Sequence, residues 1–265
     1  MVTSLLLYLV LGGVAGILAG LLGVGGGLVI VPMLNFAFTA QGIGDTYLQH
    51  LALGTSMASI MFTSVSSFRA HHRRGAVLWP VVARITPGIL LGTLVGTWIV
   101  AGLSTTFLKG FFVCFLYWVG TQMLLDIKPK ASRDLPGSVG MGGMGGIIGL
   151  VSSFVGIGGG TLSVPFLAWC NVPMHTAIGT SSAIGFPIAV AGTIGYIVNG
   201  LKATGLPEGT FGFIHLTALL GLVAASVFTA PMGARLAHSL PVAKLKRIFA
   251  VLLYLVATRM LVSLL

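Results

Sequence analysis

The stretch GLLGVGGGLVIVP, residues 20–32, interrupts one of the most apolar parts of this 265-residue chain with glycine. Glycine is a poor helix former because it loses more backbone freedom on folding than any other residue. The sequence GIGGGTLSVP at 156–165 repeats the pattern of residues 23–32 about halfway along the chain. Two matching interruptions predict one structural element that occurs once in each half.

The composition indicates the class of protein in which these glycines lie. Hydrophobic residues make up 56% of the chain and charged residues only 7%, and the mean hydropathy is +1.05. Soluble domains do not have this composition, whereas a membrane-spanning helix needs about 20 apolar residues. The apolar runs are continuous, which excludes the alternating pattern of a transmembrane barrel. We therefore expect an all-α polytopic membrane protein, with apolar segments at 4–22, 26–38, 48–68, 77–101, 106–126, 138–154, 159–171, 176–198, 210–232 and 244–263.

The charged and sulfur-containing residues exclude several other functions. The net charge of +10 comes from basic residues in the loops, which indicates membrane orientation rather than nucleic-acid binding. Cys114 and Cys170 have no paired spacing, so we expect neither a disulfide framework nor a metal site. The first apolar segment has no preceding Lys or Arg, so we interpret it as a mature helix rather than a cleaved signal peptide.

Further matches show that the chain is an internal duplication. The motif His50–Ser56, HLALGTS, corresponds to His175–Ser181, HTAIGTS, and a third block near the end of each half matches at a constant offset. Three ordered blocks make coincidence improbable. We expect an N-terminal transmembrane repeat at 1–127, a cytoplasmic linker at 128–137 and a C-terminal transmembrane repeat at 138–265, each repeat with five apolar segments.

Loop charges predict how the two repeats are oriented. Basic residues mark corresponding loops of the two repeats as lying on opposite sides of the membrane. Those residues are Arg69, Arg73, Arg74, Lys128, Lys130 and Arg133 in the first half and linker, and Arg235, Lys244, Lys246 and Arg247 in the second half. This is the pattern of an inverted-topology repeat. It requires each glycine-broken pair of segments to enter and leave the membrane on one side, and it places both termini outside the cytoplasm.

The glycine motifs are the first candidate site. Gly25, Gly26 and Gly27 in one half and Gly158, Gly159 and Gly160 in the other could each open a helix and point the next helix N-terminus inward, with Thr161 beside the second. Such an end offers free N–H donors and a partial positive charge, which suits a small oxyanion. The alternative is that the glycines only allow close helix crossing.

The repeated GTS and histidine residues form a second group of candidates. Thr55, Ser56, Thr180 and Ser181 could bind a substrate oxygen, or they could bond to backbone carbonyls one turn earlier. His50 and His175 could be helix-start residues near an interface or proton carriers.

Ionisable residues within the spans are few. Arg84 could extend back to the lipid headgroups or face a cytoplasmic vestibule that attracts anions. The four acidic residues, Asp45, Asp126, Asp134 and Glu208, all lie away from the middle of a span. An anionic substrate therefore fits the sequence better than a cationic one.

The motifs together resemble the sulfite exporter TauE/SafE family of membrane transporters. The resemblance rests on the paired glycine motifs with Pro32 and Pro165, the paired motifs Gly54–Ser56 and Gly179–Ser181, the duplicated layout and the length. It implies that these residues line or shape a pathway for sulfite, sulfoacetate or related organic anions across a bacterial inner membrane.

These observations lead to one expected function with two alternatives. We expect a secondary transporter that exports a small sulfur-containing oxyanion by alternating access, since no nucleotide-binding GxxxxGK[ST] motif is present. An anion channel or an importer shares the same motifs. An intramembrane enzyme is disfavoured because the spans hold no HExxH motif and no cluster of acids. The expected partners are a small anion and the lipid bilayer, without cofactor, metal or nucleic acid, and a homodimer stays open.

Overall fold

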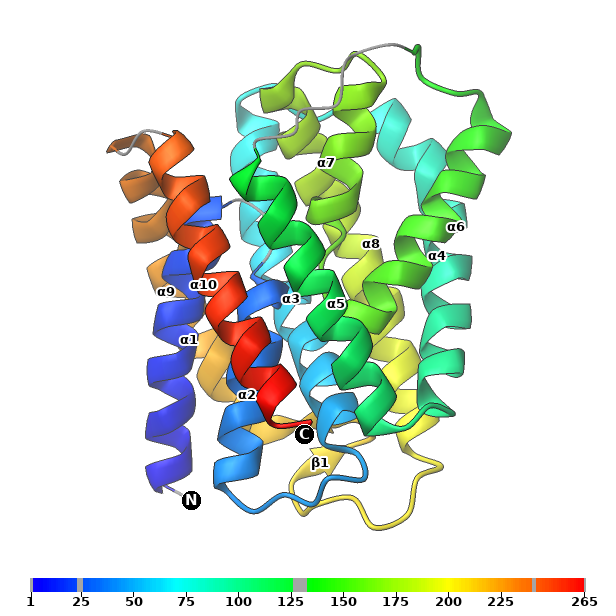
Figure 1. The fold of residues 1–265 in the computed structure, drawn as a ribbon. Coiled ribbons are helices and arrows are strands. Elements are labelled where there is room, and N and C mark those ends of the chain that lie inside the picture. The colour runs from blue at the N-terminus through cyan, green and yellow to red at the C-terminus, as the bar shows by residue number, and fades with distance from the viewer. Residues whose placement is uncertain (1, 23–25, 126–132, 240–241, 265) are drawn as a thin grey trace.

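The computed structural model describes residues 2–22, 26–125, 133–239 and 242–264. In these ranges the chain forms ten helices and one short hairpin (Figure 1). The helices are α1 (Val2–Leu22), α2 (Gly27–Ala40), α3 (Leu48–Arg73), α4 (Trp79–Ala101), α5 (Thr105–Leu124), α6 (Ser138–Val155), α7 (Gly160–Trp169), α8 (Met174–Gly200), α9 (Leu216–Ser239) and α10 (Val242–Val262). The hairpin is β1 (Thr210–Phe211) and β2 (Ile214–His215), with Thr210 opposite His215 and Phe211 opposite Ile214.

Each predicted apolar segment contains one helix, so the expected all-α polytopic membrane fold is confirmed. Among the described residues, α3, α4, α5, α6 and α8 are each long and apolar enough to cross a membrane. Shorter apolar helices occupy Leu5–Leu18, Gly27–Ala40, Gly160–Trp169 and Leu216–Thr229.

The segment at 210–232 differs from its prediction at its start. Residues 210–215 form the hairpin, and helix α9 begins only at Leu216. Gly209 and Gly212 both have positive φ, at 75° and 57°, a conformation that residues with a Cβ rarely adopt. The hairpin is attached to α8 by a hydrogen bond from Phe213 N to Tyr196 O at 3.1 Å.

Glycines let neighbouring helices approach closely. A Cβ at Gly88 or Gly92 of α4 would overlap the backbone of Gly142 or Gly146 of α6. A Cβ at Gly12 of α1 would likewise overlap Leu222 of α9. These contacts follow the small-xxx-small mode of packing found between membrane helices.

Corresponding helices of the two halves run in opposite directions in Figure 1. Helices α1 and α3 run upward in that view, whereas α6 and α8 run downward. The close pairs also correspond, because α1 packs on α9 and α6 packs on α4. This arrangement supports the inverted repeat, which stays a prediction, as do the domain boundaries.

Each glycine motif separates the two arms of a helical hairpin. Figure 1 shows α1 and α2 with their outer ends at the bottom of the molecule and α6 and α7 with theirs at the top. Gly26, Gly27 and residues 156–160 are buried, so the described parts of both motifs lie inside the protein. The two arms of each pair thus have their outer ends at one end of the molecule. The parity that the inverted repeat requires stays a prediction.

Candidate functional site

The two glycine motifs break their helices in the same way. Gly26 precedes α2 with φ 74° and ψ −13°, and Gly159 precedes α7 with φ 74° and ψ −9°. Both conformations lie in the left-handed region that glycine adopts without strain. The first-turn amides close on these residues, since Ile30 N donates to Gly26 O at 3.0 Å and Ser163 N donates to Gly159 O at 2.8 Å.

The breaks lie against each other in the protein core. A Cβ at Gly27 would overlap Gly156 O and would lie 2.9 Å from Ile157 Cα. Gly158 packs near Ile60 of α3 and Gly185 of α8. Gly160 is buried as the first residue of α7, and Gly25 lies outside the described residues. The structure thus packs Gly27 of the first motif against Gly156 and Ile157, which immediately precede the triple glycine of the second.

The helix ends at these breaks have no side-chain cap in the part of the chain that the structure describes. The first N–H groups of a helix have no partner within the helix, so an uncapped end retains donors and partial positive charge. The two ends differ in their side chains. Leu28 and Ile30 follow Gly27 in α2, whereas Thr161 and Ser163 occupy the equivalent positions in α7.

Two hydroxyls at the α7 end are buried without a partner. Ser152 Oγ of α6 and Thr161 Oγ1 of α7 find no hydrogen-bond partner among the described residues. Ser152 is fully buried and Thr161 is 9% exposed. Ser152 Oγ lies 3.6 Å from the position that a Cβ at Gly159 would take, so it faces the helix start. A buried polar group without a hydrogen bond is costly, which indicates that a ligand or water occupies this position.

The two GTS motifs have clear contacts. Thr55 Oγ1 accepts a hydrogen bond from His215 N at 2.9 Å, and Thr180 Oγ1 accepts one from Leu78 N at 3.0 Å. Both threonines are fully buried. These bonds go to the backbone just before α9 and α4, rather than to a carbonyl one turn earlier. Each hydroxyl keeps its own proton available for donation.

The serines of the same motifs face the glycine breaks. Ser56 Oγ donates to Gly156 O at 2.8 Å. Ser181 Oγ is 2.6 Å from Ser163 Oγ, which in turn donates to Gly159 O at 2.8 Å. Ser56 and Ser181 therefore belong to the neighbourhood of the α6–α7 break.

The other candidates lie apart from this break. His50 is buried, with Nε2 3.0 Å from Val100 O and its ring against Tyr47 and Phe213. His175 is exposed as the second residue of α8. Arg84 is exposed in the second turn of α4 and forms no hydrogen bond or ion pair with a described residue. Their proposed roles stay predictions.

The sequence did not single out Ser152 or Ser163. Their repeat equivalents are Ala19 and Ile30, so neither serine is repeated in the other half. Thr161 was already a candidate, and Ser163 could have been found by asking where the two glycine motifs differ in polarity. Within the described residues, no group of three or more His, Cys, Asp or Glu could hold a metal ion.

Comparison with known proteins identifies the family. The model of the family "Sulfite exporter TauE/SafE" matches residues 8–260. The chain belongs to the sulfite exporter TauE/SafE family. A protein of Haemophilus influenzae named "Probable membrane transporter protein" is 38% identical over 98% of this chain and 99% of its own. The resemblance stated from the motifs is thereby confirmed.

More distant members of the family have similar names. A probable membrane transporter protein of Methanocaldococcus jannaschii is 27% identical over 87% of this chain and 85% of its own length. The protein YunE of Bacillus subtilis, also named a probable membrane transporter, is 27% identical over 74% of this chain and 80% of its own. No solved structure matches the chain. The family and the apolar helices together make this a multi-pass membrane protein of a transporter family.

Proposed function

We propose that the protein is a secondary transporter that exports a small sulfur-containing oxyanion, sulfite or an organosulfonate such as sulfoacetate, across the bacterial inner membrane. The observation that carries the proposal is the uncapped N-terminus of α7 with two buried, unpaired hydroxyls beside it. Free amides, a helix dipole and hydroxyl donors together suit the oxygens of an anion.

The difference between the two helix ends gives the substrate a preferred position. Hydroxyl groups line the start of α7, whereas Leu28 and Ile30 line the start of α2. The negatively charged group therefore binds at α7, near Ser152 and Thr161, rather than midway between the two helix ends. The start of α2 contacts the α6–α7 turn through Gly27 and provides an apolar wall.

Transport by alternating access would expose this position to each side of the membrane in turn. An anion with one negative charge is driven outward by about 2.3 kcal/mol per 100 mV when the cytoplasm is negative. Export of such an anion therefore needs no coupled ion. The two oppositely directed halves are the elements that would move relative to each other.

The test is flux of labelled sulfite in liposomes that contain the purified protein. Ser152→Ala and Thr161→Val each remove one donor to a charged ligand, which is worth about 1.5–3 kcal/mol, so we expect KM to rise about tenfold or more. Ser182→Ala is the matched control, because Ser182 Oγ donates to the Gly179 carbonyl of its own helix at 2.7 Å.

The outcomes separate the alternatives. Wild-type kinetics in both Ser152→Ala and Thr161→Val would show that the anion does not bind at the start of α7. Saturable flux with counter-transport of unlabelled sulfite supports a transporter, whereas flux that rises linearly with sulfite concentration, without counter-transport, would instead indicate a channel. Binding that favours sulfate, thiosulfate, taurine or formate over sulfite and sulfoacetate would change the proposed substrate.

A further inference from the structure

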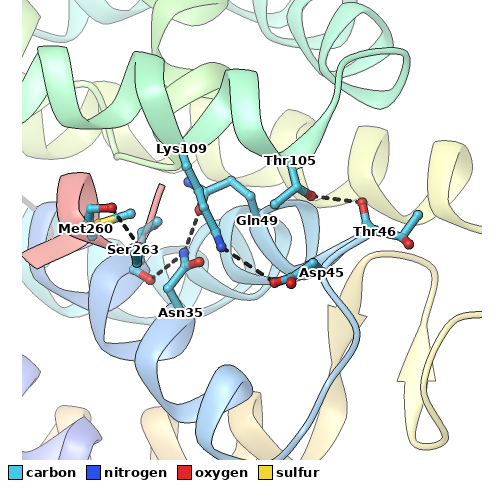
Figure 2. Close-up of polar contacts among 9 residues, drawn as sticks. Asn35, Asp45, Thr46, Gln49, Thr105, Lys109, Met260 and Ser263 are labelled. Atoms are coloured by element: carbon cyan, nitrogen blue, oxygen red, sulfur yellow. Dashed lines mark hydrogen bonds and ion pairs between the residues drawn. The ribbon is translucent and has the colours of Figure 1, made fainter. Parts of the chain in front are cut away.

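A second polar cluster lies at the far end of α2, away from the glycine breaks (Figure 2). Asn35 of α2 donates through Nδ2 to Gln49 Oε1 of α3 and to Val31 O at 3.3 Å. Lys109 of α5 extends toward Asp45 on the loop before α3, with Nζ 3.8 Å from Oδ1. Side chains from three helices and a loop therefore meet at this end of the molecule.

Lys109 is a nearly buried cation, and among the described residues it has one weak partner. Its side chain is only 12% exposed, whereas that of Asp45 is 86% exposed. An ammonium group has three N–H donors, and burying its charge is costly unless it is paired and hydrogen-bonded. At 3.8 Å an exposed carboxylate compensates this charge poorly, because water screens it. The cluster therefore retains positive charge and unused donors.

Gln49 adds a second unused donor to the cluster. Gln49 is fully buried, and its Nε2 has no partner among the described residues, because only Oε1 is engaged by Asn35. Asn35 Oδ1 likewise has no partner among the described residues, and neither has Nδ1 of His50, the residue after Gln49. Since His50 Nε2 faces the Val100 carbonyl, it carries the proton, and Nδ1 of the neutral ring accepts.

We propose that Lys109 and Gln49 form a second binding site for a small oxyanion, which displaces Asp45 from Lys109. One anion oxygen accepts from the Lys109 ammonium group and another from Gln49 Nε2. Asn35 Oδ1 accepts from the hydroxyl of a singly protonated anion. A dianion would bind more weakly, because it offers no donor to Asn35.

The position of this site relates it to the proposed pathway, and in that respect the inference rests on the proposed function. Asn35 follows Gly27 in α2, and at 1.5 Å per residue the two are separated by about 12 Å along the helix. The α2 helix thus connects the glycine breaks with the Lys109 site. An oxyanion that leaves the α7 end toward this face of the protein binds next to Lys109 before it reaches solvent.

Equilibrium binding of ³⁵S-labelled sulfite to the purified protein in detergent tests the site. The wild type should bind two sulfite ions per chain. Lys109→Met should lose one of them, while Lys202→Met, which removes a charge from the exposed loop after α8, should keep both. Asp45→Asn removes the competing carboxylate, so the affinity of the second site should rise severalfold. Asp45 is exposed, so this variant is expected to fold.

The outcomes distinguish this inference from the proposed function. Loss of one sulfite ion in Lys109→Met together with wild-type binding in Ser152→Ala/Thr161→Val would retain the Lys109 site and overturn the α7 site. Two bound ions in Lys109→Met, or unchanged affinity in Asp45→Asn, would overturn the Lys109 site. If Lys109→Met fails to fold, the Asp45→Asn result decides.

Discussion

At the scale of single residues, the glycine, threonine and serine of each GTS motif make different contacts. The glycine of each motif allows a segment from the other half to approach closely. A Cβ at Gly54 would overlap Phe213 O, just before α9, and one at Gly179 would overlap Ala76 O, just before α4. The threonine then accepts an amide hydrogen bond from the same approaching segment, and the serine faces the glycine break. The glycine and threonine of the two copies thus make equivalent contacts, whereas both serines lie near the α6–α7 break.

These contacts predict the effect of adding one methyl group. Gly54→Ala and Gly179→Ala would each place a Cβ against a backbone oxygen that cannot move independently, so we expect a loss of about 1–3 kcal/mol in the free energy of unfolding. The loss should appear as a lower Tm of the purified protein in detergent. Gly110→Ala in α5 is the matched control, since nothing lies within 4 Å of its Cβ position.

The Tm of the control variant should not fall. Alanine is favoured over glycine inside a helix by about 0.5–1 kcal/mol, so Gly110→Ala should keep or raise the Tm. An unchanged Tm in both Gly54→Ala and Gly179→Ala would contradict the close approach of the segments before α9 and α4.

The repeated residues of the site could be predicted from the sequence, and the unrepeated ones could not. Gly26 and Gly159 are recognisable because the motif occurs twice, and both precede a helix in the left-handed conformation. Ser152 is a single serine in an apolar helix, which sequence alone does not distinguish from one bonded to its own backbone. The predicted segment at 106–126 contains Lys109, but the sequence alone does not show that its side chain in α5 is only 12% exposed.

At the scale of elements, each threonine of the GTS motifs stabilises the start of another helix. Leu78 is the N-cap residue of α4, and its amide donates to Thr180 Oγ1. The amide of His215, which precedes α9, donates to Thr55 Oγ1. Helices α3 and α8 therefore fix the starts of α9 and α4 across the repeat.

This role predicts how Thr180→Val and Thr180→Ser should differ. Valine leaves the Leu78 amide without an acceptor, which costs about 1–3 kcal/mol when the group is buried. Serine keeps the oxygen, so its Tm should stay near that of the wild type. A Thr180→Val protein with unchanged Tm and a tenfold weaker affinity for sulfite would instead show that the hydroxyl binds substrate.

The hydropathy pattern predicted the positions of the helices, and the exceptions have physical causes. Helix α3 extends beyond its predicted end at 68 to Arg73, because polar residues can continue a helix after the apolar run ends. The hairpin at 210–215 was missed because strands of two residues are too short to show an alternating pattern. Its glycines mark a turn only once their positive φ is known.

At the scale of the whole molecule, α5 and α10 show how the halves correspond. Tyr117 of α5 bonds Thr258 of α10 with an oxygen–oxygen distance of 2.8 Å, and Tyr254 of α10 bonds Thr121 of α5 at 2.6 Å. Since Tyr117 matches Tyr254 and Thr121 matches Thr258 in the repeat, exchanging the halves reproduces the same pair of bonds. This relation is the one that the predicted inverted repeat, with an approximate two-fold axis between these helices, would produce.

The orientation of this axis in the membrane gives the last prediction. The exposed residues Arg69, Arg73 and Arg74 lie at the end of α3, whereas the loop after α8 holds Lys202 balanced by Glu208. The positive-inside rule therefore predicts that the end of α3 lies in the cytoplasm and the loop after α8 outside. In a variant without Cys114 and Cys170, a membrane-impermeant maleimide applied to intact cells should label Thr204→Cys.

The same reagent should label Arg74→Cys and Lys130→Cys only after the cells are permeabilised. Both probes are needed, because Arg74 reports on the end of α3 and Lys130 on the linker between the halves, which lies outside the described residues. In this orientation the Lys109 cluster, at the end where α2 finishes and α3 and α5 begin, would face the outside, and the proposed site there would receive an anion that the membrane potential drives outward. Labelling of Arg74→Cys but not Thr204→Cys from outside would show that the protein has the opposite orientation in the membrane. The proposed Lys109 site would then face the cytoplasm.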